Sequence, residues 1–177
     1  MPMFQLGFKC EPLGRGEDAV RQELIGDLAA EALFGESSQL YLKLYEEGLI
    51  DSAFGGGFET VEGMAMLTAF GDSDDPQAVL EAILQEAENL AQTGIPEEEF
   101  LRMKRSAVGR RIRGLDSFDS ICFRICAYHF SGFDYFRFPE VYEKISCQDV
   151  QDFLAKVAKP ARCSLACIYP TNQEESL

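Results

Sequence analysis

One short segment carries the residue types that most readily bind a metal ion. Cys122, Cys126 and His129 stand at i, i+4 and i+7, a spacing that puts them on one face of a helix. Thiolate and imidazole groups are good ligands for zinc and other soft metal ions, so a metal site is one interpretation. No fourth ligand stands at a suitable spacing. The favoured alternative is the buried stripe of a core helix, with His129 neutral and bonded to a backbone carbonyl.

A second segment has the features of a site for an extended chain. Residues 40–52 have the periodicity of a helix that Ser37 or Ser38 caps and that Gly48 ends. A glycine run at residues 55–57 follows in a predicted strand. A strand with so few side chains admits the close approach of another chain or a ligand. The alternative interpretation is a bulge or a weak edge strand.

The third candidate is a cluster of bases in an otherwise acidic chain. The predicted helix that follows Pro96 carries six arginine or lysine residues between positions 102 and 113. Of these, Arg105, Arg110 and Arg111 are candidates to dock an acidic surface of a partner, or the cluster guides an acidic peptide into a cavity between this chain and that partner. The default alternative is a solvated helix face with partners at i, i+4.

Hydrophobic patterns predict the elements that must position these residues. Strands are expected at residues 4–10, 53–58, 64–70 and 162–169, and helices at 17–34, 40–48, 76–93, 96–113, 117–130, 139–145 and 147–158. The fold class is α+β, with a mostly antiparallel sheet of four or more strands and long helices on one face. The strand order is expected to be ferredoxin-like with extra helices. Glu62 and Gly63 should form a tight turn, and the strand after them should be covered on both faces.

Composition bounds the domain organisation and the partners. A chain of 177 residues buries about two thirds of its unfolded surface, so we expect one domain over residues 1–170 and a polar C-terminal tail over 171–177. The 16 basic and 30 acidic residues give a net charge of −14, which argues against nucleic acid as a partner. Without a long apolar run or a basic start, we expect no membrane partner and a cytoplasmic location. The six cysteines should be reduced and act as small buried hydrophobic residues.

Several strings of residues resemble one protein family. Residues 44–54, Leu-Tyr-Glu-Glu-Gly-Leu-Ile-Asp-Ser-Ala-Phe, resemble a helix-to-strand junction of the insulinase/pitrilysin family of zinc metallopeptidases, which includes mitochondrial processing peptidase. That junction belongs to the C-terminal half, which does not bind the metal. The linker at residues 94–100 and the cap at residues 37–40 are similar to family segments in the same order. The resemblance, to the bacterial type, covers residues 4–170 and implies a sheet with long helices on one face.

The same resemblance restricts the chemistry of this chain. Family members bind zinc through an inverted His-x-x-Glu-His motif, and His129 is the single histidine here. The resemblance therefore implies zinc in a companion N-terminal half or a paired subunit, and none bound by this chain. Active members carry in this half an Arg and, seven residues on, a Tyr that stabilise the oxyanion. Tyr45 stands at the Arg position and Asp51 or Ser52 near the Tyr position, so we assign no catalytic residue and no metal ligand.

The resemblance implies one wall of a peptide-binding chamber, which assists peptide hydrolysis by the companion half. The residues expected to face an extended peptide substrate are Tyr45, Asp51, Ser52, Phe54, Gly55, Gly56, Gly57 and Phe58. The alternative function is a non-catalytic scaffold or subunit of a degenerate peptidase that binds peptides or a partner without hydrolysis. A homodimer of the isolated domain is a further expected assembly, because the apolar surface that faces the companion half would be open.

Overall fold

The computed structural model describes residues 1–61 and 63–170. The strands are β1 (Met3–Lys9), β2 (Gly55–Val61), β3 (Met64–Asp72) and β4 (Cys163–Ile168). The helices are α1 (Gly16–Phe34), α2 (Gln39–Glu46), α3 (Pro76–Thr93), α4 (Glu97–Arg113), α5 (Phe118–Phe130), α6 (Phe138–Lys144) and α7 (Cys147–Val157). Short 3-10 turns lie at Gly114–Asp116, Tyr135–Arg137 and Pro160–Arg162.

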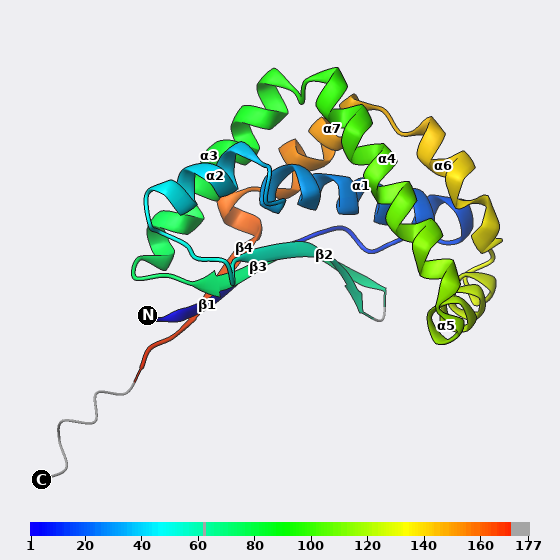
Figure 1. Ribbon diagram of the computed structural model, residues 1–177, viewed down its shortest axis with the longest axis horizontal. Coiled ribbons are helices and arrows are strands. Elements are labelled where there is room, and N and C mark those ends of the chain that lie inside the picture. The colour runs from blue at the N-terminus through cyan, green and yellow to red at the C-terminus, as the bar shows by residue number, and fades with distance from the viewer. Residues whose placement is uncertain (62, 171–177) are drawn as a thin grey trace, which may run out of the picture.

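These elements form an α+β fold, as the sequence predicts, with the long helices gathered above one face of an antiparallel sheet (Figure 1). The strand order is β2-β3-β1-β4, which is the expected ferredoxin-like order. β2 and β4 are therefore the two edge strands. No helix in the described part of the chain combines the length and the apolar character needed to cross a bilayer. The predicted tail at 171–177 lies outside the described residues.

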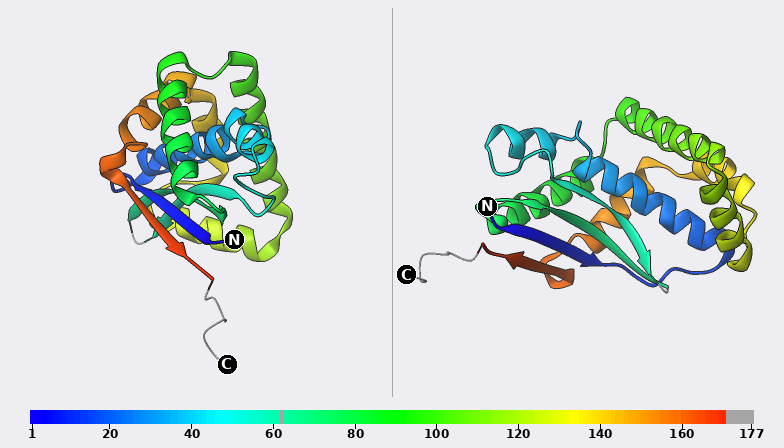
Figure 2. Two further views of the ribbon diagram at one scale, coloured as in Figure 1. Left: turned by 90° about the vertical axis from the view of Figure 1, so that its left-hand side faces the viewer. Right: turned by 60° about the horizontal axis from the view of Figure 1, so that its bottom comes forward.

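The buried face of the sheet follows from the alternation of side chains along β1. Phe4, Leu6 and Phe8 are buried beneath the helices, and their register partners on β3 are Gly71, Ala69 and Leu67. Successive side chains of a strand point to opposite faces, so the intervening residues lie on the open face. Figure 2 shows this second face without a helix layer over it.

The open face corrects one expectation from the sequence. Met64 and Phe70 of β3 are exposed, whereas Ala65, Leu67 and Ala69 between them are buried. The prediction that this strand is covered on both faces was wrong, because the helices pack on one face only. An unbroken apolar pattern is typical of a strand that is buried on both faces. An inner strand that carries large apolar residues on its open face has the same pattern.

The serine cap and the glycine that ends α2, and the glycine of the β2–β3 turn, are as predicted from the sequence. Ser38 caps α2 by accepting a hydrogen bond from the Tyr41 N–H at 3.1 Å. Gly48 follows the helix with φ 69°, the left-handed conformation that ends helices. Of the predicted turn, Glu62 lies outside the described residues and Gly63 has φ 83°.

α1 lies against β2 through a reciprocal contact at two glycines. A Cβ on Gly26 of α1 would overlap the Phe58 ring, and a Cβ on Gly56 of β2 would overlap the Phe34 ring and lie 2.6 Å from the Thr68 carbonyl oxygen. Each glycine therefore receives an aromatic ring from the other element. The close approach that the glycine run predicts is present at position 56, but a side chain of this chain makes it.

Alanine substitutions at neighbouring glycines test this contact. Gly56→Ala should lower the free energy of unfolding by about 1–3 kcal/mol, because the added methyl group must displace Phe34 or the β3 backbone. Gly57→Ala is the matched control, since a Cβ at that position has no atom within 4 Å. Urea unfolding measures both variants. Equal losses of stability at the two positions would contradict the packing described for Gly56.

α7 begins with a capping box whose aspartate also forms an ion pair. The Ser146 side chain accepts from the Asp149 N–H at 3.4 Å, and the Asp149 carboxylate accepts from the Ser146 N–H at 2.8 Å. Arg21 of α1 pairs with the same carboxylate at 2.6 Å. Burial raises the pKa of Asp149, but the bonds from Ser146 and Arg21 outweigh that effect and hold the pKa below its usual value.

A lowered pKa makes the contribution of Asp149 depend on pH. The stabilisation is present above the pKa of an unfolded aspartate, about 3.9, and is lost as the pH falls through the folded-state value. Asp149→Asn should therefore cost about 1 kcal/mol at pH 7, with the difference from the native chain shrinking towards pH 3. Thermal unfolding across this range measures the effect. Asp152→Asn, an exposed change of equal charge one turn further on, is the control. A constant difference at all pH values would refute the assignment.

Candidate functional site

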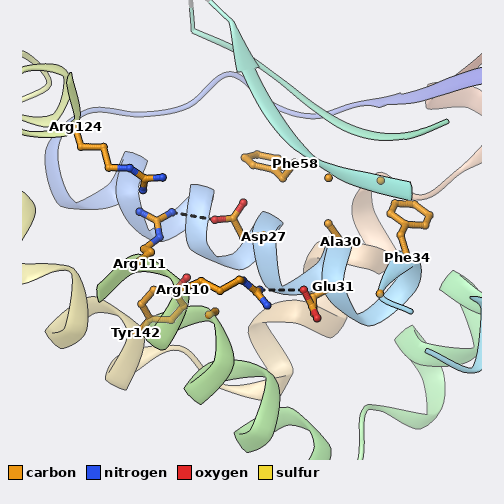
Figure 3. A pocket seen from close by; sticks show the side chains of 13 residues that line it. Asp27, Ala30, Glu31, Phe34, Phe58, Arg110, Arg111, Arg124 and Tyr142 are labelled. Carbon is orange, nitrogen blue, oxygen red and sulfur yellow. Dashed lines mark hydrogen bonds and ion pairs between the residues drawn. The ribbon is translucent and has the colours of Figure 1, made fainter. Parts of the chain in front are cut away.

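A cleft of about 390 Å³ borders β2 (Figure 3). Its lining includes Gly56, Gly57 and Phe58 of β2 and Ala30 and Phe34 of α1. The other walls come from Ala107, Arg110 and Arg111 of α4, Arg124 of α5 and Tyr142 of α6. Within the described residues β2 has one strand neighbour, so the backbone groups on its outer side have no strand partner. An unpaired strand edge beside a cleft is a geometry that admits an added strand.

The far side of the cleft is held in place by a network around Arg111. Its guanidinium pairs with Glu23 at 2.8 Å and with Asp27 at 2.9 Å, both on α1. The same guanidinium donates to the Tyr128 hydroxyl of α5 at 3.1 Å, and that hydroxyl lies 2.6 Å from Glu23. The Tyr142 ring of α6 lies 6.0 Å from the guanidinium carbon. One buried cation thus connects α4 to α1, α5 and α6.

Burial and the Arg111 charge shift the pKa values of this network in opposite directions. Burial raises the pKa of the Asp27 carboxyl, and the neighbouring Arg111 cation lowers it without fully compensating. Burial also raises the pKa of the Tyr128 hydroxyl, which therefore stays protonated and can donate to Glu23. The network holds two carboxylates around one guanidinium, so the buried cation is fully paired while Glu23 and Asp27 share its charge.

The three arginines predicted as interface residues have different positions. Arg105 is exposed on α4. Arg110 is also exposed and pairs with Glu31 of α1 at 3.0 Å. The Arg111 side chain is only 9% exposed, so the default expectation of a solvated face is wrong for this residue. Arg111 is a structural residue within the chain, and only Arg105 and Arg110 remain accessible to a partner.

The residues predicted to face a peptide are divided between three places. Tyr45 is exposed on α2 and stacks on Tyr41 with ring centroids 6.0 Å apart. Asp51 accepts a hydrogen bond from the Ala53 N–H at 2.8 Å, and Ser52 beside it is exposed. These three residues lie in and after α2, and none of them lines the cleft beside β2.

Phe54 requires a correction. It is 5% exposed, and its ring lies within 6.4 Å, centroid to centroid, of the rings of Phe4, Phe34 and Tyr41. A peptide therefore cannot reach it in this structure. Gly56, Gly57 and Phe58 line the cleft, whereas Gly55 is opposite Phe70 on β3. The cleft thus includes three of the predicted substrate-facing residues.

The helix that carries Cys122, Cys126 and His129 does not match the core interpretation. All three residues are exposed, and α5 contains no buried residue. Phe118 and Phe130 at its ends are 79% and 87% exposed. The expectation that His129 is buried was wrong, because apolar spacing indicates a face but not what packs against it. Within residues 1–61 and 63–170, no group of three or more His, Cys, Asp or Glu side chains is arranged to hold a metal ion.

The cysteines agree only in part with the prediction that they are small buried hydrophobic residues. All six are free thiols in the structure. Cys10 is buried, and burial raises the pKa of its thiol to about 11. Cys147, Cys163 and Cys167 are half-buried. The prediction of small buried residues therefore holds fully for one cysteine.

Several residues of the cleft were not found from the sequence. Asp27 and Glu31 of α1 line the cleft, and Glu23 one turn before them pairs with Arg111, but none of the three was a predicted site residue. The bases on the predicted helix after Pro96 were the signal that could have suggested their partners. Arg124 had no signal, because it stands within the apolar sequence of α5.

The fold and the cleft define a half-domain with a sheet, helices on one face and an open strand edge. Residues 1–107 match the family described as "Peptidase M16 inactive domain". The chain belongs to this family, and the predicted resemblance to the non-zinc-binding half of the insulinase/pitrilysin peptidases is confirmed.

Individual relatives are similar over nearly the whole chain. The uncharacterized zinc protease YmfH of Bacillus subtilis is 28% identical over 172 residues, which are 96% of this chain and 40% of that protein. A structure described as an M16-like peptidase from Alicyclobacillus acidocaldarius has a TM-score of 0.87 at 20% identity, covering 96% of this chain and 41% of that one. The inactive peptidase domain of a Bordetella parapertussis zinc protease has a TM-score of 0.81 at 17% identity, covering 99% and 94%. This chain therefore spans about two fifths of the first two proteins.

The residues of this chain do not fit the zinc ion that the family implies. The chain has a single histidine, and it lies on the exposed side of α5 without two further ligands near it in the described residues. No step of a zinc-dependent reaction can therefore be assigned to these side chains.

Removing the central cation tests the network. Arg111→Met should lower the free energy of unfolding by about 2 kcal/mol, because Glu23 and Asp27 lose their partner in a partly buried site. The loss is smaller than for a fully buried pair, since both carboxylates retain some contact with water. Arg105→Met, which changes an exposed arginine on the same helix, should cost less than about 0.5 kcal/mol. Similar urea midpoints for the two variants would contradict the role of Arg111.

Proposed function

We propose that this chain is the non-zinc-binding C-terminal half of a zinc metallopeptidase and forms one wall of its peptide-binding chamber. Membership of the inactive-domain family supports this proposal. The match to 40% of the zinc protease YmfH leaves room in such a protein for a companion half. That companion, as an N-terminal domain or a paired subunit, would bind zinc and carry out hydrolysis.

In this proposal the outer edge of β2 binds an extended peptide by strand addition. The backbone N–H and C=O groups of the strand would pair with the peptide backbone, and α4 and α5 would contact side chains of the peptide. Main-chain pairing tolerates many sequences, which suits a wall of a peptidase chamber. The observation that carries the proposal is the unpaired edge of β2 beside the cleft of about 390 Å³.

A non-catalytic scaffold is the second candidate function. It is favoured by Tyr45, Asp51 and Ser52, which stand where active relatives are expected to carry an Arg and a Tyr. Arg105 and Arg110 are accessible for an interface with the companion half.

We also propose a cytoplasmic location, in keeping with six free thiols. Exposed Met64 and Phe70 on the open sheet face would let the isolated chain form a homodimer.

A reconstitution experiment separates the two functions. Peptidase activity on unfolded peptides is measured for this chain, for a zinc-bearing N-terminal half from the same source, and for their mixture, each with and without chelator. Activity is expected only in the mixture, and chelator should abolish it. A stable complex that hydrolyses no peptide would refute the assisting role and favour the scaffold.

A further inference from the structure

A second cleft continues the first along β2. It has a volume of about 650 Å³ and is lined by Thr60 of β2 together with residues of α1 and α5. Asp27, Arg111 and Arg124 line both clefts. The two hollows therefore lie side by side along β2, between Gly56 and Thr60, and together we call them the β2 trough.

Arg124 is the one charged side chain lining the described β2 trough that belongs to no ion pair. Glu31 pairs with Arg110 at 3.0 Å, and Glu23 and Asp27 pair with Arg111. Arg124 has no carboxylate within 4.0 Å among the described residues. Its side chain donates a hydrogen bond to the Tyr135 hydroxyl at a long 3.4 Å. Arg124 is thus a partly buried cation that faces the trough without a counter-ion.

The direction of the Arg124 side chain adds to this observation. Figure 3 shows it extending from α5 towards Arg111 and Asp27, into the space beside Phe58. A strand added to β2 would place alternate side chains towards the helices and towards the open sheet face. Every second side chain of a bound peptide would therefore point towards the helix side of the trough, where Arg124 lies.

We propose that the β2 trough prefers extended peptides with an acidic side chain, whose carboxylate pairs with Arg124. This inference rests on the proposed strand addition at β2 and assigns a substrate class to it. A carboxylate would gain a charge-assisted hydrogen bond with a guanidinium that has no other ionic partner. A lysine or arginine side chain would instead have to compete with the pairs that Arg110 and Arg111 already make with Glu31, Glu23 and Asp27. The unpaired guanidinium of Arg124 therefore favours an anion.

Synthetic peptides test the preference on the 177-residue chain. The probes are nine-residue peptides of alternating Ser and Val, acetylated and amidated, with Glu, Gln or Lys at the central position. Dissociation constants are measured by fluorescence anisotropy at low and high salt. The Glu peptide should bind about fivefold to tenfold more tightly than the Gln peptide, and this ratio should fall as salt screens the pair.

Two variants assign the preference to one residue. Arg124→Gln should bring the Glu and Gln peptides to equal affinity, and Arg124→Glu should reverse the preference in favour of the Lys peptide. A misfolded variant cannot produce such a reversal. Arg105→Gln is the matched control, because Arg105 is an exposed arginine that lines neither cleft. It should keep the native ratio.

The outcomes separate this inference from the proposed function. Equal binding of the Glu and Gln peptides, or a preference that survives Arg124→Gln, would overturn the acidic preference and leave strand addition standing. Tight binding of the Gln peptide only when its C-terminus is a free carboxylate would also overturn it, since Arg124 would then bind a chain end. Binding of none of the peptides would overturn strand addition at β2 and the preference with it.

Discussion

The structure depends above all on the close contact between α1 and β2. Phe58 packs on Gly26 and Phe34 packs on Gly56, so the helix and the strand approach at two points where no other residue type fits. This contact fixes the face of β2 against the helices. Its outer edge remains open in the described residues, which is the feature on which strand addition would rely. The glycines thus set the packing of β2 inside the chain, and the strand order leaves its outer edge open.

The Arg111 network adds the opposite wall to this edge. α5 has no buried residue of its own, and Tyr128 bonded to Glu23 and Arg111 is one of its links to the rest of the chain. Ion pairs of this kind contribute less to stability than apolar packing, but they specify position. Because Glu23 and Asp27 pair with Arg111 and not with Arg124, the guanidinium of Arg124 is left available in the cleft. Stability and site electrostatics are therefore coupled in this region.

The sequence predicted the α+β class, the strand order and most element boundaries, because strand alternation, the Ser38 cap and Gly48 are local signals. It predicted the candidate site only in part. The glycine run was recognised, but its partner Phe34 lies on another element, and contacts between distant residues leave no periodic trace. For the same reason Phe54 was placed at the surface, and α5 was placed in the core. The spacing of apolar residues reveals which face of a helix or strand is apolar, whereas the tertiary fold decides which element packs against that face.

The central claim is that β2, and not the other edge strand, is the peptide-binding edge. Amide hydrogen exchange of the chain with and without an excess of an extended, uncharged peptide tests it most directly, because β4 provides an internal control in the same molecule. The account predicts slower exchange within Gly55–Val61 and unchanged exchange within Cys163–Ile168. Protection of β4 alone, or of neither strand at a peptide concentration that saturates binding, would contradict it.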